Sequence, residues 1–363
     1  MKVREILNLI NDVFPFQYQE SYDNAGLLIG NAEMEVTGVL VALDVTEAVI
    51  DEAVATQCNL VVAHHPLIFG GLKALTGKTY VERTVIKAVK NDIAIIASHT
   101  NTDISMNGTN TILAQKLGLK NIRPLQSSTD TLRKLVVFVP KSHFESVKKV
   151  LFEAGAGHIG HYDNTAFWTE GTGSFRGDDT THPFVGEPNK EHHEAEYRLE
   201  TIFPKHLETL VISRLKKAHP YEEVAYDIYS VQGADAQLSM GVLGDLPQSK
   251  ESMSYLNELR QFFGHPLQHT EVVKDTVHTV AVCGGTCVFM LSEAIRQKAD
   301  VFITADVKYH QFFDVDKKLI LVDAGHYETE VFTKELFFNL IIKKIPTFAV
   351  RLSEINTNPI KYL

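Results

Sequence analysis

The chain has 363 residues, of which 44% are hydrophobic and 22% are charged. This composition is typical of a globular protein, and the length predicts two or three domains. The formal net charge is -10 and no run of Lys and Arg occurs, which disfavours a nucleic-acid partner. The N-terminus lacks a secretory signal, no apolar stretch reaches the roughly 18 residues of a membrane span, and three cysteines cannot build a disulfide framework. We therefore expect a cytoplasmic protein that does not enter a membrane.

Strands and helices alternate along the first third of the chain. Residues 2–13 mix charged and apolar residues at helical spacing and predict an amphipathic helix. The apolar run 36–45 predicts a strand, and the helix after it begins with Thr46 as its N-cap. The alternation continues with strands at 59–65 and 93–103 and with helices at 79–92 and 109–119. This order indicates a parallel or mixed sheet with helices on both faces.

The last third repeats this alternation, whereas the middle of the chain differs. The order strand, helix, two strands, helix, strand over residues 134–231 is that of a ferredoxin-like domain. We therefore predict an α/β fold in which two similar three-layer α/β/α halves form a split core with one inserted domain. The predicted boundaries are 1–126 and 232–363 for the halves and 127–231 for the insertion.

Two adjacent histidines, His64 and His65, follow an apolar strand and precede Pro66. Neighbouring side chains of a strand point to opposite faces, so the pair serves one site only at the strand's end, or if each ring binds a different metal ion. Pro66 favours an extended conformation at His65, and ligands bind at the carboxyl ends of strands in open α/β sheets. Taken alone, the pair also fits a surface loop with one packed and one exposed imidazole, which is the simpler interpretation.

Two further predicted strands end in a histidine and a carboxylate. His99 and Asp103 follow one of them, although residues of this kind also form ordinary turns and helix caps. His326 and Glu330 follow the other and are four residues apart, so on a helix they share one face and can chelate a transition metal. The alternative for this pair is a solvated first helical turn, where the helix dipole favours Glu.

The three strand ends together favour a metal site over the separate alternatives. Three imidazoles and two carboxylates drawn from these strand ends are the ligand set of a two-metal hydrolytic site. The ions of such sites lie roughly 3.5–4 Å apart. Adjacent histidines that point apart would then bind one ion each.

The sequence resembles the GTP cyclohydrolase I type 2 family, also called the Nif-three-like family. The resemblance rests on "YDNAGLLIG" (22–30), "HHPLIF" (64–69), "SHTNTD" (98–103), "VAVCGG" (280–285), "DVFITADVKYH" (300–310) and "GHYETE" (325–330). It implies two divalent metal ions per chain, with zinc as the first choice and iron, manganese, cobalt or nickel as alternatives. Carried over by motif, the ligands are His64, His65, Asp103, His326 and Glu330, and Glu330 is the bridging carboxylate.

The resemblance also carries expectations for the insertion and the assembly. "GHIGHYD", "GTGSFRG" and "HPYEEVAYDIY" resemble the PII-like or CutA-like insertion of longer bacterial members. A toroidal homohexamer is implied. Three positions depart from the family pattern, namely Tyr22 in place of Trp, Ala305 in place of Gly, and Cys287 at the last glycine of a Gly-rich turn. The last departure puts a phosphate cradle at that turn in doubt.

Other polar residues have less certain roles. His99, Asp306 and His310 are candidates for groups that orient the ligands or carry protons, and their alternatives are a helix cap and surface histidines. Cys283 and Cys287 are expected to be buried free thiols. His192 and His193 lie in a polar stretch and are expected to be solvated.

The ligand set favours metal-dependent hydrolysis of a nucleotide or a related small molecule. A non-catalytic metal- or nucleotide-sensing ring is the alternative. A structural or DNA-binding ring is a third hypothesis, which the acidic net charge disfavours. Redox chemistry is disfavoured because no dinucleotide fingerprint occurs, and serine acyl transfer because no Gly-x-Ser-x-Gly motif occurs.

Overall fold

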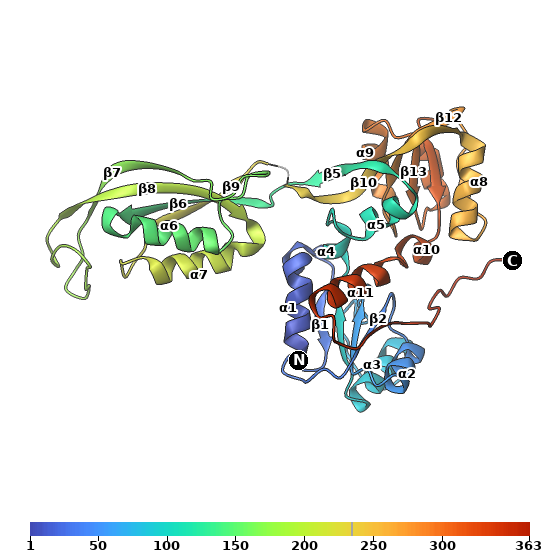
Figure 1. The fold of residues 1–363 in the computed structure, drawn as a ribbon, viewed down its shortest axis with the longest axis horizontal. Coiled ribbons are helices and arrows are strands. Elements are labelled where there is room, and N and C mark those ends of the chain that lie inside the picture. Colours follow the sequence, from blue (N-terminus) through green and yellow to red (C-terminus); the bar gives the residue numbers. More distant parts are fainter. Residues whose placement is uncertain (234) are drawn as a thin grey trace. The chain divides into compact units, whose positions relative to one another are not determined.

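The computed structural model describes residues 1–233 and 235–363, which form two compact units (Figure 1). Unit 1 consists of Met1–Ser127 and Ala236–Leu363, and unit 2 consists of Ser128–Asp235. The chain therefore leaves unit 1 once and returns to it after completing unit 2. The predicted α/β class is confirmed, since both units combine sheets with helices.

The first sheet of unit 1 has five strands in the order β1-β4-β3-β2-β15. Neighbouring strands are parallel except at β1, which runs antiparallel to β4. Every residue of the three central strands is buried, because helices cover both faces. The strands are β1 (Gly26–Ile29), β2 (Val39–Ala42), β3 (Leu60–Ala63), β4 (Ala94–Ala97) and β15 (Val350–Leu352).

Helices α2 (Glu47–Ala55) and α3 (Tyr80–Lys90) pack on one face of this sheet. Helices α1 (Val3–Val13) and α11 (Thr333–Lys344) pack on the other face. The predicted N-cap of α2 is confirmed, since the Thr46 side chain accepts a hydrogen bond from the backbone N–H of Val49.

The second sheet of unit 1 has six strands in the order β11-β14-β13-β12-β10-β5. Strands β12, β13 and β14 are parallel, while β10 and β11 run antiparallel to their neighbours β12 and β14. Helices α5 (Thr109–Lys116) and α8 (Ser252–Phe263) pack on one face and α9 (Leu291–Arg296) on the other. The strands are β5 (Lys120–Ser128), β10 (Asp235–Glu251), β11 (Gln268–His269), β12 (Thr276–Val282), β13 (Val301–Thr304) and β14 (Ile320–Asp323).

The two sheets exchange elements, so each sheet contains at least one element from the other end of the chain. Helix α11 and strand β15 come from the last third of the chain, yet they complete the first sheet. Strand β5 comes from the first third and joins the second sheet. The physical reason at α11 is burial, since Phe337 and Ile341 are fully buried against the apolar face of the first sheet.

Unit 2 contains a four-stranded antiparallel sheet in the order β7-β8-β6-β9. Helices α6 (Phe144–Glu153) and α7 (Glu208–Ala218) pack together on one face and close an apolar core. The opposite face carries no helix of the described residues (Figure 1). The strands are β6 (Leu132–Pro140), β7 (Phe167–Phe175), β8 (His192–Pro204) and β9 (Tyr226–Val231).

Short helical turns complete both units. Two of them, α4 (Thr100–Asp103) and α10 (His326–Glu330), directly follow strand ends in unit 1. The 3-10 turns are η1 (Phe16–Tyr18), η2 (Lys141–His143), η3 (Lys205–Leu207), η4 (Val288–Met290) and η5 (Tyr309–Val315).

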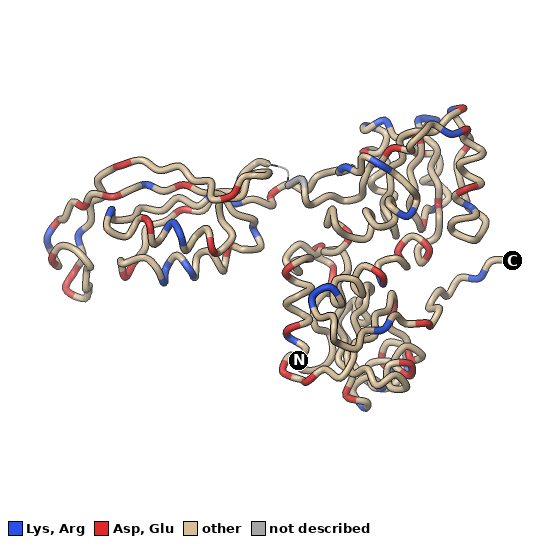
Figure 2. Tube along the Cα trace, viewed as in Figure 1, with Lys and Arg blue, Asp and Glu red and all other residues tan. Residues whose placement is uncertain are grey.

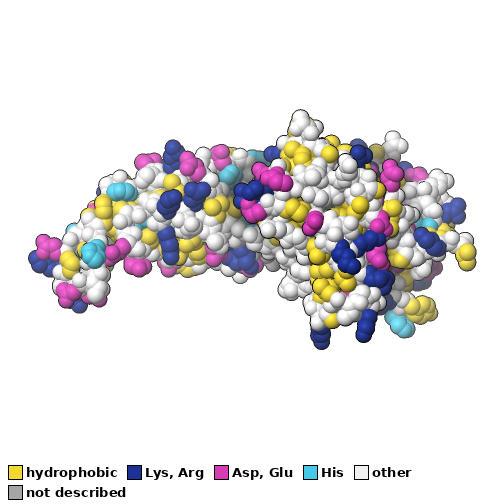
Figure 3. Space-filling model, turned by 90° about the horizontal axis from the view of Figure 1, so that it is seen from below, with side chains coloured by type: hydrophobic (Ala, Val, Ile, Leu, Met, Phe, Trp, Pro, Cys, Tyr) yellow, Lys and Arg dark blue, Asp and Glu magenta, His cyan; other side chains and the backbone are white. Residues whose placement is uncertain are grey.

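Charged residues of both signs are interspersed along the chain of both units (Figure 2). The face drawn in Figure 3 likewise mixes basic and acidic side chains rather than segregating them. This mixture gives no support to a nucleic-acid partner. Among the described residues, every helix is too short or too polar to span a bilayer.

Candidate metal centre

Polar side chains follow five strands of unit 1 at the carboxyl ends of those strands. Strands β2, β3 and β4 belong to the first sheet, and β13 and β14 belong to the second. Parallel strands end at the same edge of a sheet, so side chains that follow them lie close together. The residues are Asp44 after β2, His64 and His65 after β3, His99 after β4, Asp306 after β13 and His326 after β14.

His64 and Asp103 face each other, and the side chain of Asp103 is 16% exposed. The His64 side chain has 0% exposure, and its Nδ1 donates a hydrogen bond to the carbonyl oxygen of Ser98 at 3.0 Å. Its Nε2 lies 3.5 Å from Asp103 Oδ1. Neither of these two buried atoms has a hydrogen-bond partner among the described residues. Buried polar atoms without partners are costly, and a cation between them would satisfy both.

Glu330 connects this pair to two more histidines. Its Oε2 lies 3.8 Å from His64 Nε2, 2.8 Å from His65 Nε2 and 3.0 Å from His326 Nε2. The Nε2 atoms of His65 and His326 are 3.4 Å apart. Three imidazoles therefore converge on one carboxylate oxygen. Two overlapping sets of side chains could each hold a metal ion. The first set is His64, His65 and His99, and the second is His65, His326 and Glu330.

A carboxylate holds the outer nitrogen of three imidazoles. His65 Nδ1 donates to Asp44 at 2.7 Å, and His326 Nδ1 donates to Asp306 at 2.6 Å. His99 Nδ1 donates to Asp23 at 2.9 Å. Such pairs fix the orientation of a ring and direct its Nε2 to the centre, which is the usual arrangement around metal-binding histidines.

Burial and charge set the proton affinities of the centre. Burial lowers the pKa of His64 to about 3, and burial together with the charge of Glu330 raises the pKa of Asp103 to about 7. Burial would also lower the pKa of His65, but hydrogen bonds to Asp44 and Glu330 outweigh it and raise this pKa to about 10.

His326 and Glu330 stabilise each other's charge in the same way. Hydrogen bonds to Asp306 and Glu330 outweigh burial and raise the pKa of His326 to about 11. Burial opposes the charge of Glu330, but hydrogen bonds from His326 and His65 hold its pKa well below the usual range. Without a metal, positive charge on two imidazoles therefore balances Glu330, and a divalent cation would supply the same balance.

The structure brings all five sequence-predicted ligands, His64, His65, Asp103, His326 and Glu330, into one cluster. It also places the additional candidates His99 and Asp306 at the edge of this cluster. His310 is different, since it is exposed on η5 and contacts the rings of Tyr309 and Phe313.

Sequence reasoning missed two carboxylates, Asp23 and Asp44. Asp44 follows the apolar strand β2 as His64 follows β3, so its strand-end position is a usable signal. Asp23 precedes β1 in a loop, where it accepts hydrogen bonds from the backbone and the hydroxyl of Thr100 as well as from His99. Nothing in the local sequence around Asp23 indicates these contacts.

The turn at Gly284 and Gly285 packs against the centre. Gly285 has a φ of 62°, and a Cβ there would collide with Oε1 of Glu330. The backbone N–H groups of Gly284 and Gly285 donate to Asn110 and Thr329. Because these donors are already used, the turn positions Glu330 and does not form a phosphate cradle.

The predictions for the remaining cysteines and for His193 are confirmed, and the one for His192 is not. Cys283 and Cys287 are buried free thiols, as expected. His193 is exposed, whereas the prediction for His192 was wrong. His192 begins strand β8, is half-buried beside the ring of Phe175 and lies 3.0 Å from Glu194. The aromatic neighbour comes from another strand, so the polar local sequence gave no sign of it.

The chain is similar to known proteins along its whole length. Residues 1–359 match the family model described as Duf34/NIF3 (NGG1p interacting factor 3). A Bacillus subtilis (strain 168) protein named GTP cyclohydrolase 1 type 2 homolog is 39% identical over 373 residues, covering 99% of this chain and 98% of that protein. A solved structure, the Bacillus cereus protein related to NIF3, superposes with a TM-score of 0.84 at 36% identity, covering 100% of this chain and 99% of that chain. The chain therefore belongs to the Duf34/NIF3 family.

Proposed function

We propose that unit 1 binds two divalent metal ions and uses them to hydrolyse a nucleotide or a related small molecule. The observation that carries the proposal is the pair of buried, unpartnered atoms, His64 Nε2 and Asp103 Oδ1, beside the carboxylate of Glu330. One ion would be held by His64, Asp103 and Glu330, and the other by His65, His326 and Glu330. Glu330, whose Oε2 faces all three imidazoles, would be the ligand common to both ions.

The donor set suits several transition metals. Imidazole nitrogens and carboxylate oxygens bind zinc well, and they also accept iron, manganese, cobalt or nickel. No thiolate belongs to the set, because the centre is built from histidines and carboxylates among the described residues. We take zinc as the first choice.

Divalent ions supply Lewis acidity and activate water for hydrolysis. The residues of the chain supply position, orientation and proton transfer. Asp44, Asp306 and Asp23 hold the histidines so that each Nε2 faces the centre. His64 is fully enclosed, whereas the side chain of His326 is 33% exposed, so a substrate would approach from the side of His326.

His99 is the candidate proton carrier of the centre. Its ring centroid lies 5.2 Å from that of His64 and 5.4 Å from that of His65, and Asp23 accepts a hydrogen bond from its outer nitrogen. A histidine held in this way can pass a proton to or from a group bound at the centre.

The substrate class rests on charge and on the names of relatives. Two divalent ions would attract an anionic substrate despite the net charge of -10. The similar Bacillus subtilis protein is named GTP cyclohydrolase 1 type 2 homolog, which makes GTP the first compound to test.

The test incubates zinc-loaded protein with GTP, other nucleotides and simple phosphoesters, and separates the products by chromatography. His64→Ala should abolish turnover, whereas His310→Ala should leave it unchanged, since His310 is an exposed histidine outside the centre. Equal turnover by the wild type and His64→Ala would remove the centre from the mechanism.

A metal- or nucleotide-sensing role without catalysis is the second candidate. It is favoured by unit 2, a compact body that contributes no residue to the centre. Tight binding of one nucleotide without turnover of any compound in the same experiment would support this role over hydrolysis.

The finer architecture is also a proposal. We take the core as two similar α/β/α halves, residues 1–126 and 232–363, that surround an inserted ferredoxin-like, PII-like domain at 127–231. The antiparallel order β7-β8-β6-β9 with both helices on one face supports the ferredoxin-like interpretation. We further propose a cytoplasmic, toroidal homohexamer.

A further inference from the structure

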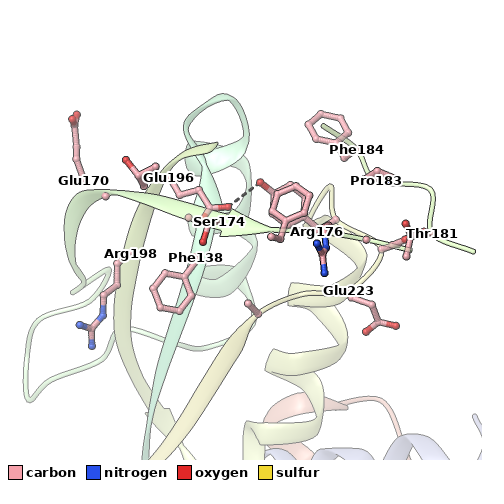
Figure 4. Close-up of a pocket in the computed structure, with 18 of the residues that line it drawn as sticks. Phe138, Glu170, Ser174, Arg176, Thr181, Pro183, Phe184, Glu196, Arg198 and Glu223 are labelled. Atoms are coloured by element: carbon pink, nitrogen blue, oxygen red, sulfur yellow. Dashed lines mark hydrogen bonds between the residues drawn. The ribbon is translucent and has the colours of Figure 1, made fainter. Parts of the chain in front are cut away.

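Unit 2 contains a cavity of about 650 Å³ that is separate from the metal centre. It lies on the face of the sheet that helices α6 and α7 do not cover. On β8, Leu199 and Phe203 belong to the core beneath the helices, while Glu196 and Arg198 alternate with them and line the cavity. The loop between β7 and β8 covers part of the cavity with Phe184 (Figure 4). A cavity of this volume suits a ligand the size of an amino acid or a nucleoside.

A buried carboxylate lies in the wall of the cavity. Glu196 is only 7% exposed, and its Oε1 accepts a hydrogen bond of 2.8 Å from the hydroxyl of Tyr221 (Figure 4). Burial and this contact with Glu196 raise the pKa of Tyr221, so Tyr221 stays a hydrogen-bond donor. A Cβ at Gly173 would collide with Oε2 of Glu196, so the glycine leaves room for the carboxylate.

No cationic side chain of the described residues forms an ion pair with Glu196. Arg198 pairs instead with Glu200, at 2.9 Å. Arg176 is exposed on the strand-to-loop junction, on the same side of the cavity as Glu223 (Figure 4). A carboxylate that is nine-tenths buried and forms no ion pair among the described residues favours a ligand that brings a positive charge.

Four aromatic side chains stand among the polar and small residues of the wall. Phe138, Phe175, Phe184 and Tyr221 line the cavity, with ring centroids 5.8 Å apart for Phe175 and Tyr221 and 6.4 Å apart for Phe184 and Tyr221. Aromatic faces attract cations and also accept the apolar body of a ligand. The buried anion and the aromatic walls therefore select the same kind of molecule.

We propose that this cavity binds a small organic cation, with an ammonium or similar group against Glu196 and an apolar or aromatic body among the four rings. The Tyr221 hydroxyl keeps the carboxylate in place, and the loop that carries Phe184 closes over the ligand. This site is independent of the metal centre, because its residues all belong to unit 2.

Calorimetric titration of the full chain with three compounds that share one ring tests the proposal. Benzylamine is a cation at neutral pH, benzyl alcohol is neutral and benzoate is an anion. We expect saturable binding of one benzylammonium per chain, at least about 10-fold tighter than benzyl alcohol, and weaker binding of benzoate. Glu196→Gln should weaken benzylammonium about 10- to 100-fold and leave benzyl alcohol nearly unchanged.

Glu187→Gln is the matched control, since Glu187 is an exposed carboxylate on the loop that carries Phe184 and pairs with Lys190. It should leave all three affinities unchanged. If circular dichroism shows that Glu196→Gln does not fold, Phe184→Ala replaces it. This variant should fold because Phe184 is exposed, and it should weaken the binding of benzylammonium because Phe184 lines the cavity.

Three outcomes would overturn the proposal. Tighter binding of benzoate than of benzylammonium would indicate an anion site at Arg176. Equal benzylammonium binding by Glu196→Gln and the wild type would remove Glu196 from the site. Absence of saturable binding by all three probes would also overturn it. In that case, a change of sedimentation coefficient in Phe184→Ala would indicate that this face contacts another copy of the chain.

Discussion

Glu330 is the residue whose substitution tests the metal centre most directly. Its Oε2 lies within 3.0 Å of both His65 and His326 and 3.8 Å from His64. Asp103 Oδ1 instead lies 3.5 Å from His64 Nε2. If Glu330 bridges two ions, Glu330→Gln removes a charged ligand from both, whereas Asp103→Asn removes one from a single ion. The two isosteric variants should therefore differ in how much metal they lose.

The magnitude of the effect follows from the linkage between binding and folding. At a free metal concentration 100 times the dissociation constant, each ion stabilises the folded state by about 2.7 kcal/mol, so two independent ions contribute about 5 kcal/mol. For a unit of this size, about 1 kcal/mol shifts the midpoint of thermal unfolding by roughly 2–4 °C. Zinc should therefore raise the midpoint of the wild type by roughly 10–20 °C, that of Asp103→Asn by about half as much, and that of Glu330→Gln by little.

The assay combines metal analysis by mass spectrometry with calorimetric unfolding, before and after treatment with a chelator. His310→Ala is the control histidine variant and should behave as the wild type, because His310 is exposed on η5. Retention of two ions per chain by Glu330→Gln would refute the bridging role. Equal loss of metal in Asp103→Asn and Glu330→Gln would refute the assignment of one ion to His64 and the other to His65.

Proton release, the independence of unit 2 and the assembly state are three further measurable consequences. Because carboxylate partners outweigh burial and raise the pKa of His65 to about 10 and of His326 to about 11, zinc must displace protons at neutral pH. Calorimetry in buffers of different ionisation enthalpy should show release of about two protons per chain. If no proton is released, the rings of His65 and His326 are not protonated in the metal-free protein. Without metal, the raised pKa values of His65 and His326 stabilise the folded state. This stabilisation is complete below pH 6.5 and is lost as the pH rises through 10 to 11. Urea unfolding at a series of pH values across that range would detect the loss. Replacement of unit 2 by a Gly/Ser linker should leave soluble protein with its full metal content, since the centre uses no residue of unit 2. Sedimentation should give a hexamer, and a monomer at micromolar concentration would rule out the toroidal assembly.

The residues of the cluster could be found from the sequence because apolar runs stop at polar residues at three strand ends, and because the motifs there resemble those of a known family. An apolar run that stops at a histidine marks the carboxyl end of a buried strand, as at His64 after β3 and at His326 after β14. The supporting carboxylates could not be found in this way. Asp44 and Asp23 act through contacts with histidines 21 and 76 residues away, and an Asp in a loop by itself indicates only a turn or a cap.

The arrangement of the sheets shows what local pattern could not predict, namely which sheet each late element joins. Alternation of strands and helices predicts a sheet but does not say which sheet a later strand joins. Helix α11 carries apolar residues that could pack on either sheet. In the structure, Phe337 packs on the first sheet beside Phe14. Strand β15 then follows α11 into the first sheet. Tertiary packing, which sequence periodicity does not encode, makes this choice.

The same exchange of elements bears on how the centre is held together. His65 and Glu330 are 265 residues apart, and they come from the ends of strands in different sheets. Helix α11, which begins three residues after Glu330, is anchored in the core of the first sheet, while β14 before it belongs to the second. Glu330 therefore lies on the segment that physically connects the two sheets. Metal bound between His64, His65 and Glu330 would therefore stabilise the contact between the sheets, because these side chains follow strands that belong to different sheets.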